Sequence, residues 1–451
     1  MGKINSILSY LIYLLLFLTF ALAPIDIALN IRILGFNLRA GFLVMVILTA
    51  LLVIIVTRDV LLGKQRLALP LYLILLLIVA VINLLFVPNS IYIPRGLVYA
   101  LTLILFTFLI LFLINAREYV SLEKIIDIYV LSFLLHAFLG TLQFVLFYVF
   151  GTNFFMLQPG RINGLTYEPS YYVTYLTPGL ILTMLMALFL VERKEKIIFY
   201  SLTSSLVLLV LAFSTSKLGV VEAIIVILLA IAVGVFLKLF KGSKDMNLKR
   251  NISYLVAFTV LFASIFYVSG NIGNIIYSAF SGKKKISHIS YIEKTKELIA
   301  SSKEASFDIR LGQFKETLEI ILENPLLGRS LGGVAPYRAV KHGMNPKDNE
   351  DVKQFEGMNI FAEMLAGFGI IGFLLMLGFI IAISYDAIRL SIKVLASNHN
   401  ISIVLIGLAL GFLLELFFLM FNQNVLRLYL WSHIGLLALA IEKVRYEYFH
   451  G

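Results

Sequence analysis

Twelve long apolar blocks constrain this chain more than any other feature of its sequence. Each block has about 17–28 residues, enough for a helix to cross roughly 30 Å of hydrocarbon. Backbone groups in lipid must bond within their own segment, and the blocks lack the alternation of a membrane β-barrel. The blocks cover about 7–23, 41–57, 68–87, 96–114, 123–150, 171–190, 197–213, 219–238, 252–269, 358–384, 401–421 and 425–442. The sequence therefore predicts an all-α integral membrane protein with about twelve transmembrane helices.

Composition and charge agree with this prediction. Hydrophobic residues make up 60% of the 451 residues and charged residues 14%, whereas a soluble domain has roughly 25% charged residues. Eighteen Lys and Arg residues lie in one set of short connections and six in the other. By the positive-inside rule the first set is cytoplasmic, together with both termini. The net charge of +11 reflects this topology, and we expect no nucleic-acid partner.

The connection between the ninth and tenth blocks is too long for a linker. The chain accordingly divides into transmembrane helices (1–269), an extracytoplasmic loop (270–357), and further transmembrane helices with a cytoplasmic tail (358–451). Within the loop, apolar residues at helical spacing over 306–323 predict an amphipathic helix that ends at Asn324-Pro325. Such a helix should lie on the membrane interface or cap the bundle. Glu316, Glu319 and Glu323 should point away from its apolar stripe.

Residues 160–172 concentrate polar groups between two apolar blocks. Arg161, Asn163, Glu168 and Ser170 lie there, with Gly164 and Pro169 between them. A simple connector would not need this composition, so we interpret the segment as the rim of a pocket on the outer face. The alternative for Arg161 and Glu168 is a structural salt bridge.

Several classes of site are disfavoured. The chain has no cysteine, its histidines show no metal-ligand spacing, and no nucleotide-binding motif is evident. We predict no metal and no cofactor. Some polar residues lie inside the apolar blocks, where they are costly in lipid and should bond between helices or line a cleft. These are His136, Gln143, Glu222 and Glu415.

Three motifs together resemble the superfamily of O-antigen ligases and O-antigen polymerases. The first is Arg161-Ile-Asn-Gly164 with Glu168-Pro169-Ser170. The second is Arg310 on a helix that leads into Asn324-Pro325-Leu326-Leu327-Gly328. The third is Asn359, Glu363, Gly369 and Gly372 at the start of the tenth block, and Ser214-Thr215-Ser216-Lys217 is a weaker fourth. The order and sidedness of these motifs, over roughly 160–385, carry the resemblance.

The resemblance implies a metal-independent, inverting glycosyltransferase of the GT-C type in the bacterial inner membrane, with its active site on the periplasmic face. Its donor would be a glycan on undecaprenyl pyrophosphate. A polymerase transfers the glycan to another lipid-linked repeat unit, and a ligase transfers it to lipid A-core. Ligases usually have histidine where this chain has Met358, and Glu-Pro-Ser is more similar to polymerases. We therefore favour an O-antigen polymerase of the Wzy type, for which a chain-length regulator is a candidate partner besides membrane lipids.

Glycosyl transfer builds negative charge on the departing diphosphate, and arginine stays charged and binds phosphate through two parallel bonds. We predict Arg161, Glu168 and Arg310 as catalytic, with Glu168 as the first choice for the proton acceptor. Predicted substrate-binding residues are Tyr167, Lys217, Gly328, Arg338, His342, Asn359 and Glu363.

A flippase or transporter of lipid-linked oligosaccharide is the alternative from another class. A transporter would place its polar groups near the middle of the bilayer, often in inverted repeats. Here they concentrate on one face, and no internal repeat is evident, which favours an enzyme.

Overall fold

The computed structural model describes the chain from residue 2 to 449. It leaves out 34–35, 215, 242–246, 282–304, 349–350, 353–354, 357–358 and 422–424. Side chains are not described at 2–5, 30–37, 240–241, 271–281 and 305–311 either.

Every predicted apolar block forms a helix. The helices are α1 (Gly2–Leu22), α2 (Ala40–Leu61), α3 (Leu71–Leu85), α4 (Ile93–Asn115), α5 (Leu122–Phe150), α6 (Pro169–Phe189), α7 (Lys194–Phe213), α8 (Lys217–Lys241), α9 (Leu248–Ser281), α14 (Ile360–Val394), α15 (His399–Leu419) and α16 (Leu428–Phe449). Among the described residues, nine of them are long and apolar enough to cross a membrane. The described apolar parts of α1 and α3 are shorter, and α16 carries several charges near its C-terminal end. The structure thus supports an all-α, multi-pass membrane protein.

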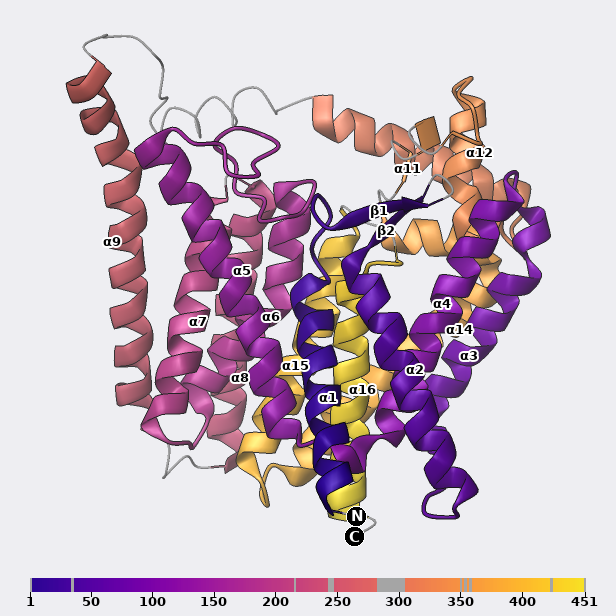
Figure 1. Cartoon of the computed structure of the whole chain (residues 1–451), viewed down its shortest axis with the longest axis horizontal. Coiled ribbons are helices and arrows are strands. Elements are labelled where there is room, and N and C mark those ends of the chain that lie inside the picture. Colours follow the sequence, from indigo (N-terminus) through magenta and orange to yellow (C-terminus); the bar gives the residue numbers. More distant parts are fainter. Residues whose placement is uncertain are drawn as a thin grey trace.

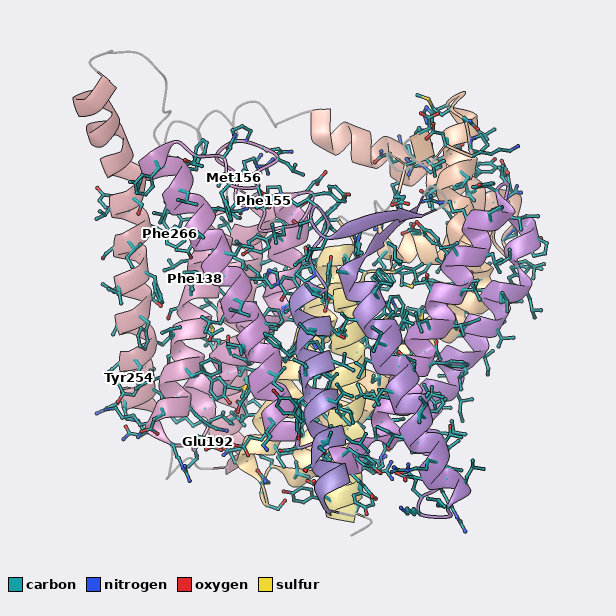
Figure 2. The ribbon with its side chains drawn as sticks, in the orientation of Figure 1. Phe138, Phe155, Met156, Glu192, Tyr254 and Phe266 are labelled. Carbon is teal, nitrogen blue, oxygen red and sulfur yellow. The ribbon has the colours of Figure 1, made fainter. Side chains whose placement is uncertain are left out.

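The bundle has two distinct ends (Figure 1). One end holds the first residues of α1 and the last residues of α16, and we call it the terminal face. The opposite end, the loop face, holds the 151–168 connection, the hairpin of β1 (Asn30–Ile33) and β2 (Phe36–Arg39), α11 (Ala305–Glu323) and α12 (Val334–Lys341). Figure 2 shows Phe155 and Met156 near the loop face and Glu192 and Tyr254 near the terminal face. This separation matches the prediction that both termini lie opposite the long loop.

α6 forms the centre of the bundle. Of its most apolar window, 94% is buried, and it packs mainly against α7 and α15. By contrast, large apolar side chains on outer helices remain exposed, such as Phe138 of α5, which is 61% exposed (Figure 2). Exposed apolar surface of this kind suits contact with lipid.

α11 spans Ala305–Glu323 and is a helix where the sequence predicts one over 306–323. Its buried residue Ile320 packs with Val334 of α12 and Ala366 of α14, while Leu318 and Leu322 of the apolar stripe are exposed. The acids do point away from this stripe, but they have partners that the sequence did not indicate. They pair with the basic residues that follow: Glu316 with Arg338 and His342, Glu319 with Lys341, and Glu323 with Arg329 and Tyr337.

α14 is broken near its start, and the loop after α11 fits into the break. Gly369 has φ 65° inside the helix. The freed backbone groups bond to the neighbouring loop, with Ile370 N–H donating to Pro325 O (2.8 Å) and Arg329 N–H to Ala366 O (2.9 Å). Gly328 also has positive φ (67°), and a Cβ there would come within 2.5 Å of the Gly367 carbonyl oxygen. Only glycine tolerates both conditions.

Candidate active site

The 160–168 segment is a braced loop. The Gln143 side chain bonds Gly164 in both directions, donating to its carbonyl (2.6 Å) and accepting from its N–H (2.9 Å). Asn163 Nδ2 donates to Thr166 O (2.6 Å), and Thr166 Oγ1 donates back to Asn163 O (2.8 Å). Gly164 has φ 55°, and the Tyr172 ring fills the space beside it. The polar residues of this segment therefore build a hydrogen-bonded loop.

Arg161 and Glu168 lie on this loop without forming an ion pair. Arg161 Nη1 donates to Gln158 Oε1, and its buried Nε–H has no acceptor. Burial lowers the pKa of Arg161, and the Glu168 charge opposes that effect. Glu168 is exposed and accepts a hydrogen bond from Ser170 Oγ (3.1 Å). The structural salt bridge considered above is not formed, so both side chains retain bonding capacity.

The loop is joined to a buried charge group. The N–H groups of Asp26 and Ile27 donate to Leu165 O (2.8 and 3.1 Å). The Asp26 carboxylate lies 2.5 Å from Arg39 and accepts two 3.2 Å bonds from Arg427. One carboxylate thus serves two guanidinium groups.

The two guanidinium groups differ in their pKa values. Burial lowers the pKa of Arg39 despite Asp26. At Arg427, burial acts the same way, but Asp26 and nearby tyrosines outweigh it and raise the pKa. Arg427 also lies over the Tyr171 ring at 4.7 Å, and its buried Nε–H has no acceptor in the described part of the chain.

Two more arginines are buried, Arg95 near the start of α4 and Arg338 on α12. Arg95, which is 3% exposed, pairs with Glu356, and Tyr99 also donates to Glu356 (2.7 Å). Arg338, which is 2% exposed, donates to Glu316 (3.1 Å) and to Phe355 O (2.7 Å). Burial lowers the pKa of Arg338, with Glu316 opposing. The Nη2 group of Arg338 is buried and has no acceptor among the described residues.

Glu363 connects these groups. Its side chain is 7% exposed and interacts electrostatically with Arg338, Arg95 and Arg427. One carboxylate oxygen of Glu363 is buried and receives no hydrogen bond from the residues that the structure describes. We name the set of Arg39, Arg95, Arg338 and Arg427, with Asp26 and Glu363, the loop-side arginine cluster. Tyr167 acts electrostatically on Arg39, which links the 160–168 loop to it.

The other predicted residues occupy different positions. Asn359 caps α14, its Oδ1 accepting from the N–H groups of Phe361 and Ala362. His342 is bonded to Glu316 (2.8 Å) and stacks on Phe355. Lys217 is exposed at the start of α8, and Gly328 packs against α14 as described above. Arg310 lies within α11, but its side chain, like residue Met358, falls outside the described residues.

The sequence interpretation missed Arg39, Arg95 and Asp26 as site residues and gave Arg427 little weight. The sequence did contain a signal for these arginines. They belong to the six Lys and Arg residues in the outer set of short connections, which the positive-inside rule expects to hold few basic residues. Cations that resist the topological bias need another reason to be there, and a binding site supplies one.

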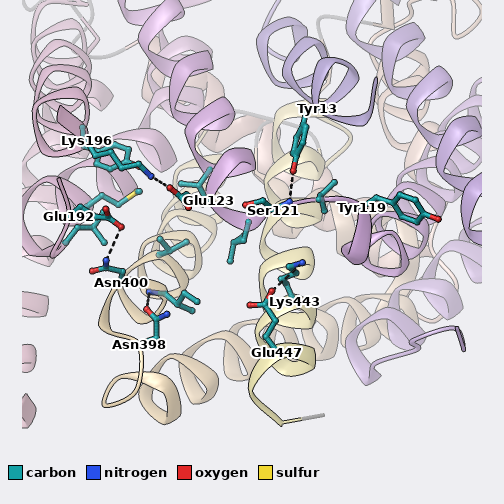
Figure 3. Close-up of a pocket in the computed structure, with 18 of the residues that line it drawn as sticks. Tyr13, Tyr119, Ser121, Glu123, Glu192, Lys196, Asn398, Asn400, Lys443 and Glu447 are labelled. Carbon is teal, nitrogen blue, oxygen red and sulfur yellow. Dashed lines mark hydrogen bonds and ion pairs between the residues drawn. The ribbon is translucent and has the colours of Figure 1, made fainter. Parts of the chain in front are cut away.

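A second polar region lies at the terminal face (Figure 3). It is a cavity of about 580 Å³ between the ends of α5, α7, α15 and α16. Its two lysines are already bound: Lys196 pairs with Glu123, and Lys443 pairs with Glu447 (3.4 Å) and donates to Arg117 O (2.9 Å). In the described part of the chain, no group of three His, Asp or Glu side chains is arranged to hold a metal ion.

Comparison with known proteins adds one finding. No curated protein matches the chain. The family model described as O-antigen ligase (Wzy_C) matches residues 179–377, a little under half of the 451 residues. The match includes Arg310, Arg338 and Glu363 and stops short of Arg161 and Arg427. It supports the superfamily of O-antigen ligases and polymerases that the motifs indicated, and with it a membrane enzyme of that type.

Proposed function

We propose that the protein is a metal-independent, inverting glycosyltransferase that polymerises undecaprenyl-pyrophosphate-linked repeat units of a surface polysaccharide. The observation that supports this most directly is a set of buried guanidinium N–H groups, at Arg161, Arg338 and Arg427, that have no acceptor among the described residues. A buried donor without an acceptor is costly, and a diphosphate would satisfy several at once.

The arginines would hold and stabilise the leaving diphosphate. As the bond from the anomeric carbon to the phosphate oxygen breaks, negative charge grows on that oxygen. Donors fixed before the reaction stabilise such charge without reorganising. Arg161 would bind at the loop, and Arg338 and Arg427 deeper in the cluster. Lys217, Tyr167 and His342 would contact the glycan or headgroup from the same face.

Glu168 would accept the proton of the attacking hydroxyl. Glu168 is exposed, and in the described structure its carboxylate is hydrogen-bonded only to Ser170, so an acceptor sugar can reach it. Glu363 is enclosed among arginines, which suits a carboxylate that balances charge and orients their donors.

Purified protein supplied with an undecaprenyl-pyrophosphate repeat unit should make a ladder of longer chains in the presence of a chelator. Arg161→Ala and Arg310→Ala should each abolish the ladder while protein yield persists. Arg389→Ala is the matched control, because Arg389 is an exposed arginine near the opposite end of α14. Normal ladders from both test variants would refute the proposal.

Glu168→Gln tests the proton acceptor. General base catalysis contributes about 100-fold or more, so turnover should fall by that order while binding of the lipid-linked substrate persists. Unchanged turnover would leave Glu168 with a structural role only.

The acceptor is tested separately. We expect products only on a second lipid-linked repeat unit, as the Glu168-Pro169-Ser170 motif suggests. If lipid A-core becomes glycosylated instead, the protein is a ligase.

A further inference from the structure

Below the loop-side arginine cluster, α15 and α16 bring a carboxyl and an imidazole together inside the bundle. Glu415 and His433 are each no more than 1% exposed, and Glu415 Oε2 lies 3.2 Å from His433 Nδ1. His433 Nε2 lies 2.9 Å from Leu408 O. A carbonyl oxygen only accepts, so Nε2 must carry a hydrogen.

That assignment constrains the state of the pair. If Glu415 were ionised and Nδ1 bare, two electron-rich atoms would lie 3.2 Å apart in a medium of low dielectric constant. A proton between them removes the conflict, whether it is bound to Glu415 or to Nδ1. A pair that holds one proton in addition to the Nε2 hydrogen avoids this conflict.

A small cavity adjoins the pair. Its volume is about 10 Å³, and its lining residues are Phe20, Ala23, Tyr129, Tyr175, Pro178, Glu415, Tyr429 and Ser432. Two hydroxyls in this lining, those of Tyr429 and Ser432, are buried and have no hydrogen-bond partner among the described residues. Neither does Glu415 Oε1. The Tyr175 hydroxyl also lines the cavity and has Ser132 as a partner.

This combination of size and polarity matches one water molecule. A site of roughly 10–15 Å³ with two to four polar partners holds a water, whereas apolar cavities stay empty. The three unpartnered polar atoms, on Glu415, Tyr429 and Ser432, would otherwise each bear a desolvation cost. Four titratable side chains interact with Glu415. They are Tyr129 from α5, Tyr175 from α6, and Tyr429 and His433 from α16.

We propose that this cavity binds one ordered water, which hydrogen-bonds Glu415, Tyr175, Tyr429 and Ser432, and that this water and the Glu415–His433 pair together form a buried proton-holding site. The site joins α6, α15 and α16 beneath the cluster. Tyr429 connects this site to the loop-side arginine cluster, because it interacts electrostatically with Glu415 and also with Arg427 and Asp26. The proposal does not depend on the reaction that the protein catalyses.

Filling the cavity tests the water. Ala23→Val places two methyl groups toward it. An empty cavity would gain contacts, and the Tm would rise; a bound water would be displaced from its polar partners, and the Tm would fall. Overpacking could also lower the Tm, so the same substitution is made in a Tyr175→Phe/Tyr429→Phe background. Displacement of water predicts a smaller fall there, because fewer groups are left unpaired. An equal fall in both backgrounds, or a rise in the wild type, would overturn the proposal.

Two further measurements test the occupant and the proton. Replacing sodium by choline should leave the Tm unchanged, and a sodium-dependent rise would identify a cation instead of water. In the protein labelled with ¹⁵N-histidine, His433 Nδ1 should show a hydrogen-bonded resonance that shifts in Glu415→Gln. A resonance that does not respond to this substitution would rule out the shared proton.

Discussion

The loop-side arginine cluster and the terminal-face cavity are both polar, yet their cations are used differently. In the cavity, the ammonium groups of Lys196 and Lys443 are engaged by neighbouring carboxylates and a carbonyl. In the cluster, Arg338 and Arg427 also pair with carboxylates, but each keeps a buried N–H for which the described part of the chain offers no acceptor. A guanidinium has five donors in a rigid fork, and an ammonium has three on a flexible stem. Pairing therefore neutralises the lysines and leaves the arginines with donors for an anion.

The proposed difference between the two regions would be wrong if exchanging arginine and lysine had the same effect on activity at both. Arg427→Lys keeps the charge next to Asp26 and removes the fork, so we expect glycosyl transfer to fall about 100-fold, as for loss of one preorganised transition-state donor. Lys196→Arg makes the opposite exchange at the terminal face and should change activity less than about 2-fold, within the ~0–1 kcal/mol of an exposed pair. Initial rates with a lipid-linked repeat unit measure both.

Yield and thermal stability of the same samples provide the control for folding. If Lys196→Arg proved the more damaging change, the site would have to be placed at the terminal face.

Gly328 tests whether the loop face needs its fixed backbone. Gly328→Ala would combine positive φ, costing about 1–2 kcal/mol, with overpacking against Gly367 and Gly369, costing about 1–3 kcal/mol more. Gly343 also has positive φ (71°), but no neighbouring atom lies within 4 Å of the position that a Cβ would take there. Gly343→Ala should therefore show only the first cost. Equal losses of Tm in the two variants would mean that the fit between the loop and α14 contributes little.

Much of the fold was predictable, since about twenty apolar residues suffice to specify a membrane helix. Each block became a helix, and the helix over 306–323 was placed almost to the residue. The break in α14 was not predictable, because Gly369 takes positive φ only in response to the loop at Leu326. Local pattern carries no information about such tertiary contacts.

Only part of the site was predictable, because several of its contacts join residues that are far apart in sequence. The polar composition of residues 160–168 singled out this loop, although distant residues such as Gln143 and Asp26 also hold it. The Arg427–Asp26 pair joins residues 401 positions apart, and Arg95 meets Glu356 across 261. Without the fold, each of these residues is one isolated charge among many, so the cluster emerges only when the helices are assembled.

The contact between α11 and α12 offers the mildest test, through pH. Glu316 is buried in part, which raises its pKa, but hydrogen bonds from His342 and Arg338 outweigh burial and lower it below the ordinary 4.5. A lowered folded-state pKa contributes stability that is complete above the ordinary value and is lost as pH falls through the folded value. Acidification below pH 4.5 should thus loosen α12 from α11 while the apolar bundle persists. Hydrogen exchange of the α12 amides would report it.

In Glu316→Gln the exchange should already be faster at neutral pH and should lose most of its acid dependence. If the wild type and this variant responded alike to acid, other carboxylates would control the contact, and Arg338 would not depend on Glu316 for its position.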